Sequence, residues 1–407
     1  MGGKKKYSGY KSFQYLEAGF DYKTYELCKE LGRVKYHEVP LSKAEEERFR
    51  GIIEDNIVIS LHDHPTISPV DMSLALELKS MGRQFTAYEA LSVSGLDCVF
   101  DNMMDGTAYI TSYNGWKWTD IIHDIGIRFS DIHHQDLIKP CYRVQDIRDA
   151  FENEQIAFVF CLESATPIEN ELDRIDVLYG LGIRSMGICY SASNMLGGGH
   201  REPENGLTDF GYDAIKRMNK LGMLIDRGHA NNRTVKEAIE ASDKPIYVSH
   251  SMPTGVTNQP HNTSDDVLHA LAENDGVFAL YGGGYGAVTE KHPVGSIEGY
   301  GECLEYLIDL MGVDHVGCGP DTMYGDQQGL YVYWFPRPLA HYTRPGKKAS
   351  SRPPIPEGMV DPGYVRGLEN PNEFVNIARW MIVNGYSDAE IVKVIGGNAL
   401  RLMEQAW

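Results

Sequence analysis

The sequence predicts an α/β protein folded as a (β/α)8 barrel, the TIM barrel. Short apolar runs alternate with longer amphipathic stretches along most of the chain, which is the pattern of repeated strand and helix units around a parallel sheet. Eight such runs are present, and eight parallel strands are the number that closes this barrel. The runs lie at residues 57–61, 96–100, 156–162, 183–189, 223–226, 246–249, 277–281 and 315–319.

The predicted strands differ in the strength of their pattern. Residues 156–162 form an uninterrupted apolar run, which is typical of a strand buried on both faces. Residues 96–100 give the weakest pattern because Asp97 and Asp101 interrupt the neighbourhood. Both still fit one parallel sheet with the other six runs.

Amphipathic stretches predict helices between the strands. Residues 209–221 place apolar side chains on one side at helical spacing and are followed by Gly222, a common residue at helix ends. Residues 264–272 begin with Ser264 and acidic residues, which suit a helix N-terminus. The chain ends in a helical pattern at residues 371–407. We expect these helices to pack outside the barrel.

Two segments do not follow the barrel pattern, and they define the expected domain organisation. Residues 1–50 are mixed and charged and are interpreted as an N-terminal extension to a barrel domain at 51–407. Residues 331–362 contain seven prolines and several aromatic residues, and we interpret them as an insertion after the eighth strand. The insertion is either a lid or wall over the pocket or a surface or subunit-contact loop.

Composition excludes several classes of function. The chain has 407 residues, of which 42% are hydrophobic and 23% charged, as in ordinary globular proteins. Its net charge of -19 argues against nucleic acid as a partner. No run approaches the roughly 18 apolar residues of a membrane span. Seven cysteines without a Cys-x-x-Cys pair favour reduced thiols, so we expect a cytoplasmic protein that acts on a small molecule.

Histidine and acidic side chains follow five of the predicted strands. Residues just after the strand ends of a barrel gather in one pocket, so ligands far apart in sequence can meet at one metal site. Imidazole and carboxylate groups are good ligands for zinc. These residues are His62 and His64 after the first strand, Glu163 after the third, His229 after the fifth, His250 after the sixth and Asp321 after the eighth.

Each of these residues has an ordinary interpretation when taken alone. Two histidines spaced as His62 and His64 can be hydrogen-bonded surface residues, and Glu163 can form a salt bridge with an arginine. Buried histidines are often satisfied by backbone groups, and Asp321 can cap a helix. The coincidence of five strand ends favours a metal site. His62 and His64 alternate on an extended backbone, so both side chains point the same way.

Several motifs of the chain are specific when taken together. They are Glu163, Gly-Leu-Thr-Asp-Phe-Gly at 206–211, Leu-Gly-Met-Leu-Ile-Asp at 221–226 leading to His229, Ser-His-Ser at 249–251, residues 262–268, Asp321 and residues 396–401. With these motifs the chain resembles the membrane dipeptidase (renal dipeptidase-like) family of zinc peptidases in the amidohydrolase superfamily, from about residue 57 to the end. The resemblance implies a (β/α)8 barrel with two zinc ions, with other divalent metals as an alternative. It implies that Glu163 bridges the ions, that His62 and His64 bind one, and that His229 and His250 bind the other.

Three positions depart from the pattern of that family. His64 stands where the family usually has an aspartate, a change that preserves metal binding. Tyr190 aligns with the histidine that polarises the substrate carbonyl, and a phenol can still donate a hydrogen bond. His261 aligns with the arginine that holds the terminal carboxylate of a dipeptide, and a neutral imidazole is a poor substitute for a guanidinium. The loss of this arginine makes a neutral or blocked amide an alternative to an ordinary dipeptide as the substrate.

The resemblance implies hydrolysis of an amide bond, in a dipeptide or a dipeptide-like molecule, by a hydroxide bridging two metals. Asp321 is expected to act as general base and then general acid, and Tyr190 to stabilise the oxyanion. Tyr190, His261 and Tyr281 are the expected substrate-binding residues. The habit of the family suggests a homo-oligomer.

Other reactions remain open at the same site. A non-peptide amide is one alternative. A phosphoester or phosphoramidate is another, because the glycine-rich loop at 281–286 offers backbone amides, although a tight loop also explains the glycines. A metal-dependent lyase or decarboxylase could use the same ligands. The complete ligand set argues against a catalytically silent binding protein.

Overall fold

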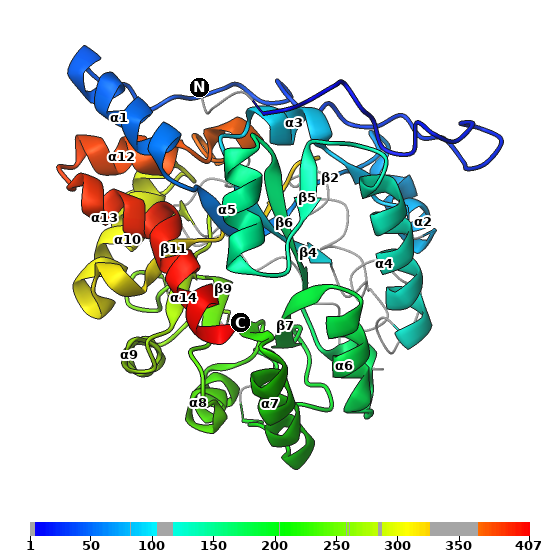
Figure 1. Ribbon diagram of the computed structural model, residues 1–407. Coiled ribbons are helices and arrows are strands. Elements are labelled where there is room, and N and C mark those ends of the chain that lie inside the picture. Colours follow the sequence, from blue (N-terminus) through cyan, green and yellow to red (C-terminus); the bar gives the residue numbers. More distant parts are fainter. Residues whose placement is uncertain are drawn as a thin grey trace.

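The computed structural model shows a parallel sheet curled into a barrel and surrounded by helices (Figure 1). The predicted insertion at 331–362 lies outside the part of the chain that is described, and so do residues 284–286 of the glycine-rich loop. The structure describes residues 5–81, 83–103, 117–202, 204–257, 259, 261–283, 287–325 and 365–407.

All eight predicted strands are confirmed. The strands at 156–162 and 183–189 have the predicted bounds, and the other six differ by at most three residues at either end. Neighbouring strands of the barrel are all parallel, in the order β11-β10-β9-β8-β7-β6-β4-β1-β12. Their bounds are β1 Ile59–His64, β4 Cys98–Met103, β6 Ile156–Leu162, β7 Ile183–Cys189, β8 Leu224–Gly228, β9 Tyr247–Ser251, β10 Val277–Leu280 and β11 Val316–Cys318.

The eighth strand is divided, and this division brings the ends of the sheet together. Its first half, β11, pairs with β10, whereas β12 (Thr322–Met323) pairs with β1. Only residues 319–321 separate β11 from β12. Because the two ends of the strand order are consecutive in the chain, the sheet closes on itself, and Asp321 lies at the junction. Two further strands, β2 (Thr66–Ile67) and β3 (Phe85–Thr86), form a small antiparallel sheet, and β5 (Ile138–Pro140) pairs with the start of β6.

The predicted helices are present around the strands (Figure 1). The predicted helix at 209–221 has those bounds. Thr208 caps it by accepting a hydrogen bond from the Gly211 amide, and Gly222 ends it with a φ of 75°. The helices are α1 Lys43–Asp55, α2 Ala75–Ser80, α3 Tyr88–Val93, α4 Trp118–Ile132, α5 Val144–Glu152, α6 Asp173–Gly180, α7 Asp209–Leu221, α8 Asn232–Ala241, α9 Asp265–Glu273, α10 Ile297–Met311, α12 Asn376–Val383, α13 Asp388–Val392 and α14 Asn398–Ala406.

Two apolar clusters occupy the two faces of the sheet. Leu61, Phe100 and Val159 belong to the cluster inside the barrel, which α5 and α14 close at one end. Phe158 and Val248 belong to the larger cluster between the strands and the outer helices. Strands buried on both faces explain why the sequence shows continuous apolar runs. The apolar interior leaves the C-terminal strand ends as the place where polar side chains gather.

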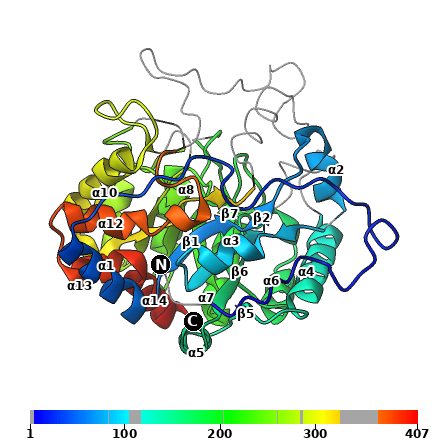
Figure 2. The same ribbon diagram turned by 90° about the horizontal axis from the view of Figure 1, so that it is seen from above.

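The N-terminal segment packs along the outside of the barrel (Figure 2, dark blue). Tyr10 and Phe13 are buried, and the Tyr10 hydroxyl and the Phe13 amide both donate to the carboxylate of Asp131 in α4. Lys5 forms a buried ion pair with Asp97. The predicted boundary at residue 50 falls inside α1. Among the described residues, no helix is both long and apolar enough to cross a membrane.

Candidate metal centre

The six predicted ligand residues meet at one end of the barrel. His62 and His64 are in β1, and His250 is in β9. Glu163 directly follows β6, His229 directly follows β8, and Asp321 lies between β11 and β12. Because all these strands are parallel, the residues share the C-terminal face of the sheet.

One group of potential ligands is formed by His62, His64 and Asp321. Oδ1 of Asp321 lies 3.4 Å from Nε2 of His62 and 3.1 Å from Nε2 of His64. Tetrahedral bonds of about 2.1 Å place ligand atoms about 3.4 Å apart. The group therefore has the spacing that a zinc ion needs. Its residues come from β1 and from the segment that joins β11 to β12.

A second group is formed by Glu163, His229 and His250. Oε1 of Glu163 lies 2.8 Å from Nε2 of His229 and 3.8 Å from Nε2 of His250, and the two imidazole nitrogens are 3.1 Å apart. Oε1 of Glu163 is also 3.9 Å from Nε2 of His62, a member of the first group. Glu163 thus lies between the two groups, which is the position of a bridging carboxylate.

Unpartnered atoms at the centre also fit the binding of a cation. Nε2 of His62 and Oε2 of Glu163 are buried without a hydrogen-bond partner among the described residues. Both residues are at most 2% exposed. Buried polar atoms are normally satisfied, and leaving one without a partner costs about 1–3 kcal/mol. A metal ion satisfies both atoms, so the residues present fit the metal that the ligand pattern implies.

Hydrogen bonds around the centre orient the imidazoles. Nδ1 of His64 donates to the backbone carbonyl of Asn102 at 2.7 Å. Nδ1 of His62 and Nδ1 of His250 lie 3.1 and 2.9 Å from the hydroxyl of Ser249. That hydroxyl donates to Asp226 Oδ2 at 2.7 Å. A hydroxyl has one proton and two lone pairs, so it accepts from both histidines, and each Nε2 keeps its lone pair for a metal.

The backbone around the ligands is tightly constrained. A Cβ on Gly187 would lie 2.0 Å from the carbonyl oxygen of Glu163, so only glycine allows β7 to pass this close. Gly228 has a φ of 56° and also approaches that carbonyl. Asp321 has a φ of 59°, which is uncommon for a residue other than glycine, and its amide donates to the His62 carbonyl at 3.0 Å. These contacts fix the ligands in place.

The electrostatics of the metal-free chain are those of a cation site. Burial raises the pKa of Glu163 to about 7. Burial also acts to lower the pKa of His64, but Asp321 outweighs it, and the pKa rises to about 9. Burial acts to raise the pKa of Asp321, but the adjacent imidazoles of His62 and His64 outweigh it and hold that pKa well below its usual value. A proton on His64 therefore supplies positive charge where a metal would otherwise do so.

The three predicted substrate-binding residues border the second group. The Tyr190 ring stacks on His229 with centroids 4.2 Å apart. The His261 ring lies 4.5 Å from that of His229, and the Tyr281 ring lies 6.3 Å from that of His250. The structure thus brings all three to the same side of the centre.

The phosphate-binding interpretation of the glycine-rich loop gains no support from its described part. The Tyr281 amide donates to the Ser251 carbonyl at 2.9 Å, and the Gly282 amide donates to the Pro320 carbonyl at 3.2 Å. Both donors are therefore already used by the backbone. The alternative substrates with a scissile phosphoryl group accordingly rest on sequence alone.

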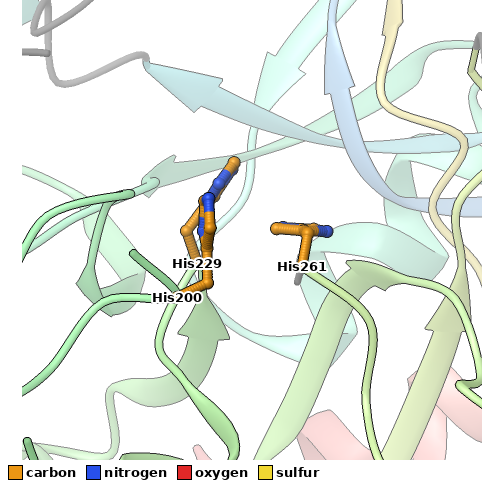
Figure 3. Close-up of side chains that lie close together, drawn as sticks. All are labelled: His200, His229 and His261. Atoms are coloured by element: carbon orange, nitrogen blue, oxygen red, sulfur yellow. The ribbon is translucent and has the colours of Figure 1, made fainter. Parts of the chain in front are cut away.

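The sequence analysis missed two residues of this site. His200 lies in the loop after β7, and its ring is 5.7 Å from that of His229 and 5.3 Å from that of His261 (Figure 3). Arg227 is fully buried in β8 and donates to the His261 carbonyl. Burial and the charge of Arg227 lower the pKa values of His200 and His261 well below the usual value for histidine.

A sequence signal for these two residues existed but was weak. His200 ends the run Gly-Gly-Gly-His at 197–200, and Arg227 stands inside a strand motif where an ionised side chain is unusual. His200 lies eleven residues beyond the run at 183–189, and Arg227 directly follows the run at 223–226 but carries a cationic group, which is not a metal ligand.

Comparisons with known proteins agree with this geometry. The model of the family described as "Membrane dipeptidase (Peptidase family M19)" matches residues 128–330. The chain is similar to the dipeptidase verJ of Clonostachys rogersoniana, with 26% identity over 292 residues that cover 70% of this chain but only 63% of that relative. The match thus spans less than two thirds of the length of this curated relative.

Solved structures share the fold. An amidohydrolase from Pseudomonas aeruginosa superposes with a TM-score of 0.71 and 23% identity, covering 90% of this chain and 99% of the other. A metallo peptidase from Rhodobacter sphaeroides, solved with a phosphinate mimic of the dipeptide L-Ala-D-Ala, gives a TM-score of 0.65 and 18% identity, with coverage of 87% and 100%. At these identities the structural similarity establishes only the barrel fold. The chemistry has to be inferred from the residues of the site.

Proposed function

Because the chain belongs to the membrane dipeptidase family, we propose that it is a metal-dependent hydrolase that cleaves the amide bond of a dipeptide or a dipeptide-like molecule. The observation that carries the proposal is the convergence of the six ligand residues on one face of the barrel. Glu163 of the second group also approaches His62 of the first, and both residues have buried polar atoms without partners among the described residues. A merely structural cluster would be expected to satisfy these atoms.

We propose two zinc ions as the metals. The first would be held by His62, His64 and Glu163, with Asp321 in reach, and the second by Glu163, His229 and His250. Imidazole nitrogens with a shared carboxylate are a donor set that suits zinc, although manganese or cobalt could also be bound. The replacement of a carboxylate by His64 keeps this donor set intact.

In the proposed reaction, water adds across the amide bond, giving a carboxylic acid and an amine. Two divalent ions, when bound, lower the pKa of a shared water and polarise the carbonyl group. Asp321 accepts the proton of the attacking water and returns it to the leaving nitrogen. Its pKa, held well below the usual value by His62 and His64, supports an ionised carboxylate with a lone pair free for that proton. The phenol of Tyr190, stacked on His229, donates a hydrogen bond to the carbonyl oxygen as charge develops there.

The test is to strip the chain of metal, reload it with zinc and follow a substrate panel by mass spectrometry. The panel contains L-Ala-L-Ala, L-Ala-D-Ala, N-acyl amino acids and phosphoesters. We expect two zinc ions per chain by elemental analysis and hydrolysis of at least one dipeptide. Uptake of the elements of water by the product excludes a lyase or a decarboxylase. Cleavage of phosphoesters alone would overturn the proposal.

Asp321→Asn separates proton transfer from metal binding. The amide keeps an oxygen that can approach a metal but cannot accept the proton, so we expect turnover to fall by about 10²–10⁴-fold with zinc content unchanged. Asp243→Asn, at an exposed position, is the control that should leave both unchanged. Full activity of Asp321→Asn would refute the assigned role.

A further inference from the structure

One strand of the barrel wall, β4, lies between the two groups of potential ligands, and none of its residues belongs to either group. On one side of β4 are β1, with His64, and the junction of β11 and β12, with Asp321; on the other side is β6, which leads to Glu163. Near its C-terminal end β4 carries Asn102, which is 2% exposed. Nδ1 of His64 donates to the backbone carbonyl of Asn102 at 2.7 Å, so this residue contacts the first group.

The side chain of Asn102 faces the inside of the barrel. Alternate residues of a strand share a face, and Phe100, two residues earlier, belongs to the apolar cluster inside the barrel. Asn102 also pairs in register with Cys161, which belongs to the same cluster and stands two residues before Glu163. The carboxamide of Asn102 therefore lies on the inner wall between His64 and Glu163, at the point where the apolar interior ends and the polar mouth begins.

One atom of this carboxamide has nothing to bind. Nδ2 of Asn102 donates to the Phe100 carbonyl at 3.4 Å. Turning the carboxamide over would set two oxygen atoms against each other, so this contact fixes which end is the acceptor. Oδ1 is buried without a hydrogen-bond partner among the described residues, which costs about 1–3 kcal/mol. A carboxamide oxygen can only accept, so its partner has to be a proton donor or a cation.

The chemistry of the centre favours a proton donor. Zinc prefers imidazole and carboxylate ligands, and the two groups already supply these, whereas a neutral carbonyl oxygen suits harder cations. The proposed reaction brings one proton donor to this place, which is the water that attacks the amide bond. A water molecule has two protons, and Asp321 is assigned to only one of them.

We propose that Asn102 positions the attacking water by accepting a hydrogen bond at Oδ1 from the proton that the water keeps. Asp321 takes the other proton from the opposite side of His64. With both protons held by the wall of the barrel, a lone pair of the water oxygen is directed toward the substrate carbonyl. No bond of Asn102 forms or breaks in this step. The inference rests on the proposed function, because it concerns the water of that reaction.

The variants remove or keep the acceptor oxygen. Asn102→Leu replaces the carboxamide by an apolar group of similar size, Asn102→Ala removes it, and Asn102→Asp keeps an acceptor. All three retain the backbone carbonyl that orients His64. Asn219→Leu is the matched control, because Asn219 is also buried and its Nδ2 also lacks a partner among the described residues, but it lies in α7 and accepts from Ser242, away from the centre.

Three quantities are measured on the zinc-loaded chain. Elemental analysis gives the zinc content, and kcat and KM are determined for the dipeptide of the panel that is cleaved best. Titration calorimetry without substrate measures the binding of fluoride. Fluoride can take the place of water in the centre, but it has no proton and cannot donate a hydrogen bond to Asn102.

We expect Asn102→Leu and Asn102→Ala to lower kcat about ten- to hundredfold, because the attacking oxygen is no longer held in place, with KM changed less than about threefold and zinc content unchanged. Asn102→Asp should recover part of kcat. Fluoride should bind about three- to tenfold tighter to Asn102→Leu, because the water that it displaces has lost an acceptor and the fluoride no longer faces the amide oxygen. Asn219→Leu should change none of these quantities.

Other outcomes would overturn the inference. Loss of zinc from folded Asn102→Leu would make Oδ1 a metal ligand. Unchanged or weaker fluoride binding would show that Oδ1 does not hold the water of the centre, and a rise in KM alone would assign it to the substrate. If no variant hydrolyses any substrate, the proposed function fails, whereas the fluoride titration still decides whether Asn102 holds the water.

Discussion

Replacement of Ser249 by alanine tests whether one hydroxyl sets the affinity of both metal groups. This hydroxyl lies 3.1 Å from Nδ1 of His62, in the first group, and 2.9 Å from Nδ1 of His250, in the second. It donates to the buried carboxylate of Asp226 at 2.7 Å. Ser249→Ala therefore frees one ligand of each group to rotate or to change tautomer.

The magnitude follows from these contacts. Loss of a hydrogen-bond partner that orients a metal ligand costs about 10–100-fold in metal affinity. Each group has one such ligand on Ser249, so both binding steps should weaken by about this factor, or about 1.4–2.8 kcal/mol per step. If the Ser249 hydroxyl oriented only one of the two histidines, its removal would weaken only one of the two zinc-binding steps.

Competition with a chelator measures the two steps, because stepwise zinc transfer resolves two dissociation constants. Ser185→Ala is the matched control, since Ser185 is also buried in the barrel but bonds to the Tyr247 hydroxyl and contacts no ligand. We expect the control to leave both constants unchanged. Weakening of a single step in Ser249→Ala, or of neither, would refute the coupling of the two groups through this hydroxyl.

Further predictions concern protons and packing. Because the pKa values of His64 and Glu163 are about 9 and about 7, a bound metal ion must displace protons at pH 7, and zinc affinity should rise between pH 6 and 9. Titration calorimetry in buffers of different ionisation enthalpy should detect this proton release. Absence of proton release would contradict these pKa values. Gly187→Ala should destabilise the fold by about 1–3 kcal/mol in urea unfolding because of the Glu163 carbonyl, whereas Gly180→Ala, with open space around its Cβ, should not. Asp97→Ala should cost about 3–5 kcal/mol because it leaves Lys5 buried and unpaired, against less than about 1 kcal/mol for the exposed pair lost in Asp388→Ala.

The strands could be predicted because a strand that is buried on both faces has a continuous run of apolar residues in the sequence. Residues 156–162 are apolar throughout and form a strand with those bounds. The candidate ligands could be predicted from the same runs, because each of them stands directly after a run or within three residues of its end. The weak run at 96–100 also corresponds to a strand, β4, because both acids are paired: Asp97 with Lys5 and Asp101 with Arg128.

What could not be predicted depends on contacts between distant segments. The N-terminal segment has no helical or strand period, and its position is set by partners such as Asp131, more than a hundred residues away. His200 is brought to the site by a loop that is pinned to the end of β8. Arg227 looked like part of a strand, because its polar partners are backbone carbonyls that no sequence pattern reveals.

The charge balance of the whole site supports an anionic substrate. The proposed ligands supply two carboxylates, Glu163 and Asp321, and Asp226 adds a third behind Ser249. If two divalent ions are bound as proposed, they and Arg227 together carry more positive charge than these acids neutralise. His64 contributes to this excess, because a neutral imidazole stands where a carboxylate would have offset one charge. In a pocket of low dielectric the remaining field acts strongly on any substrate. A substrate bearing an anionic group beside its amide bond would compensate that field.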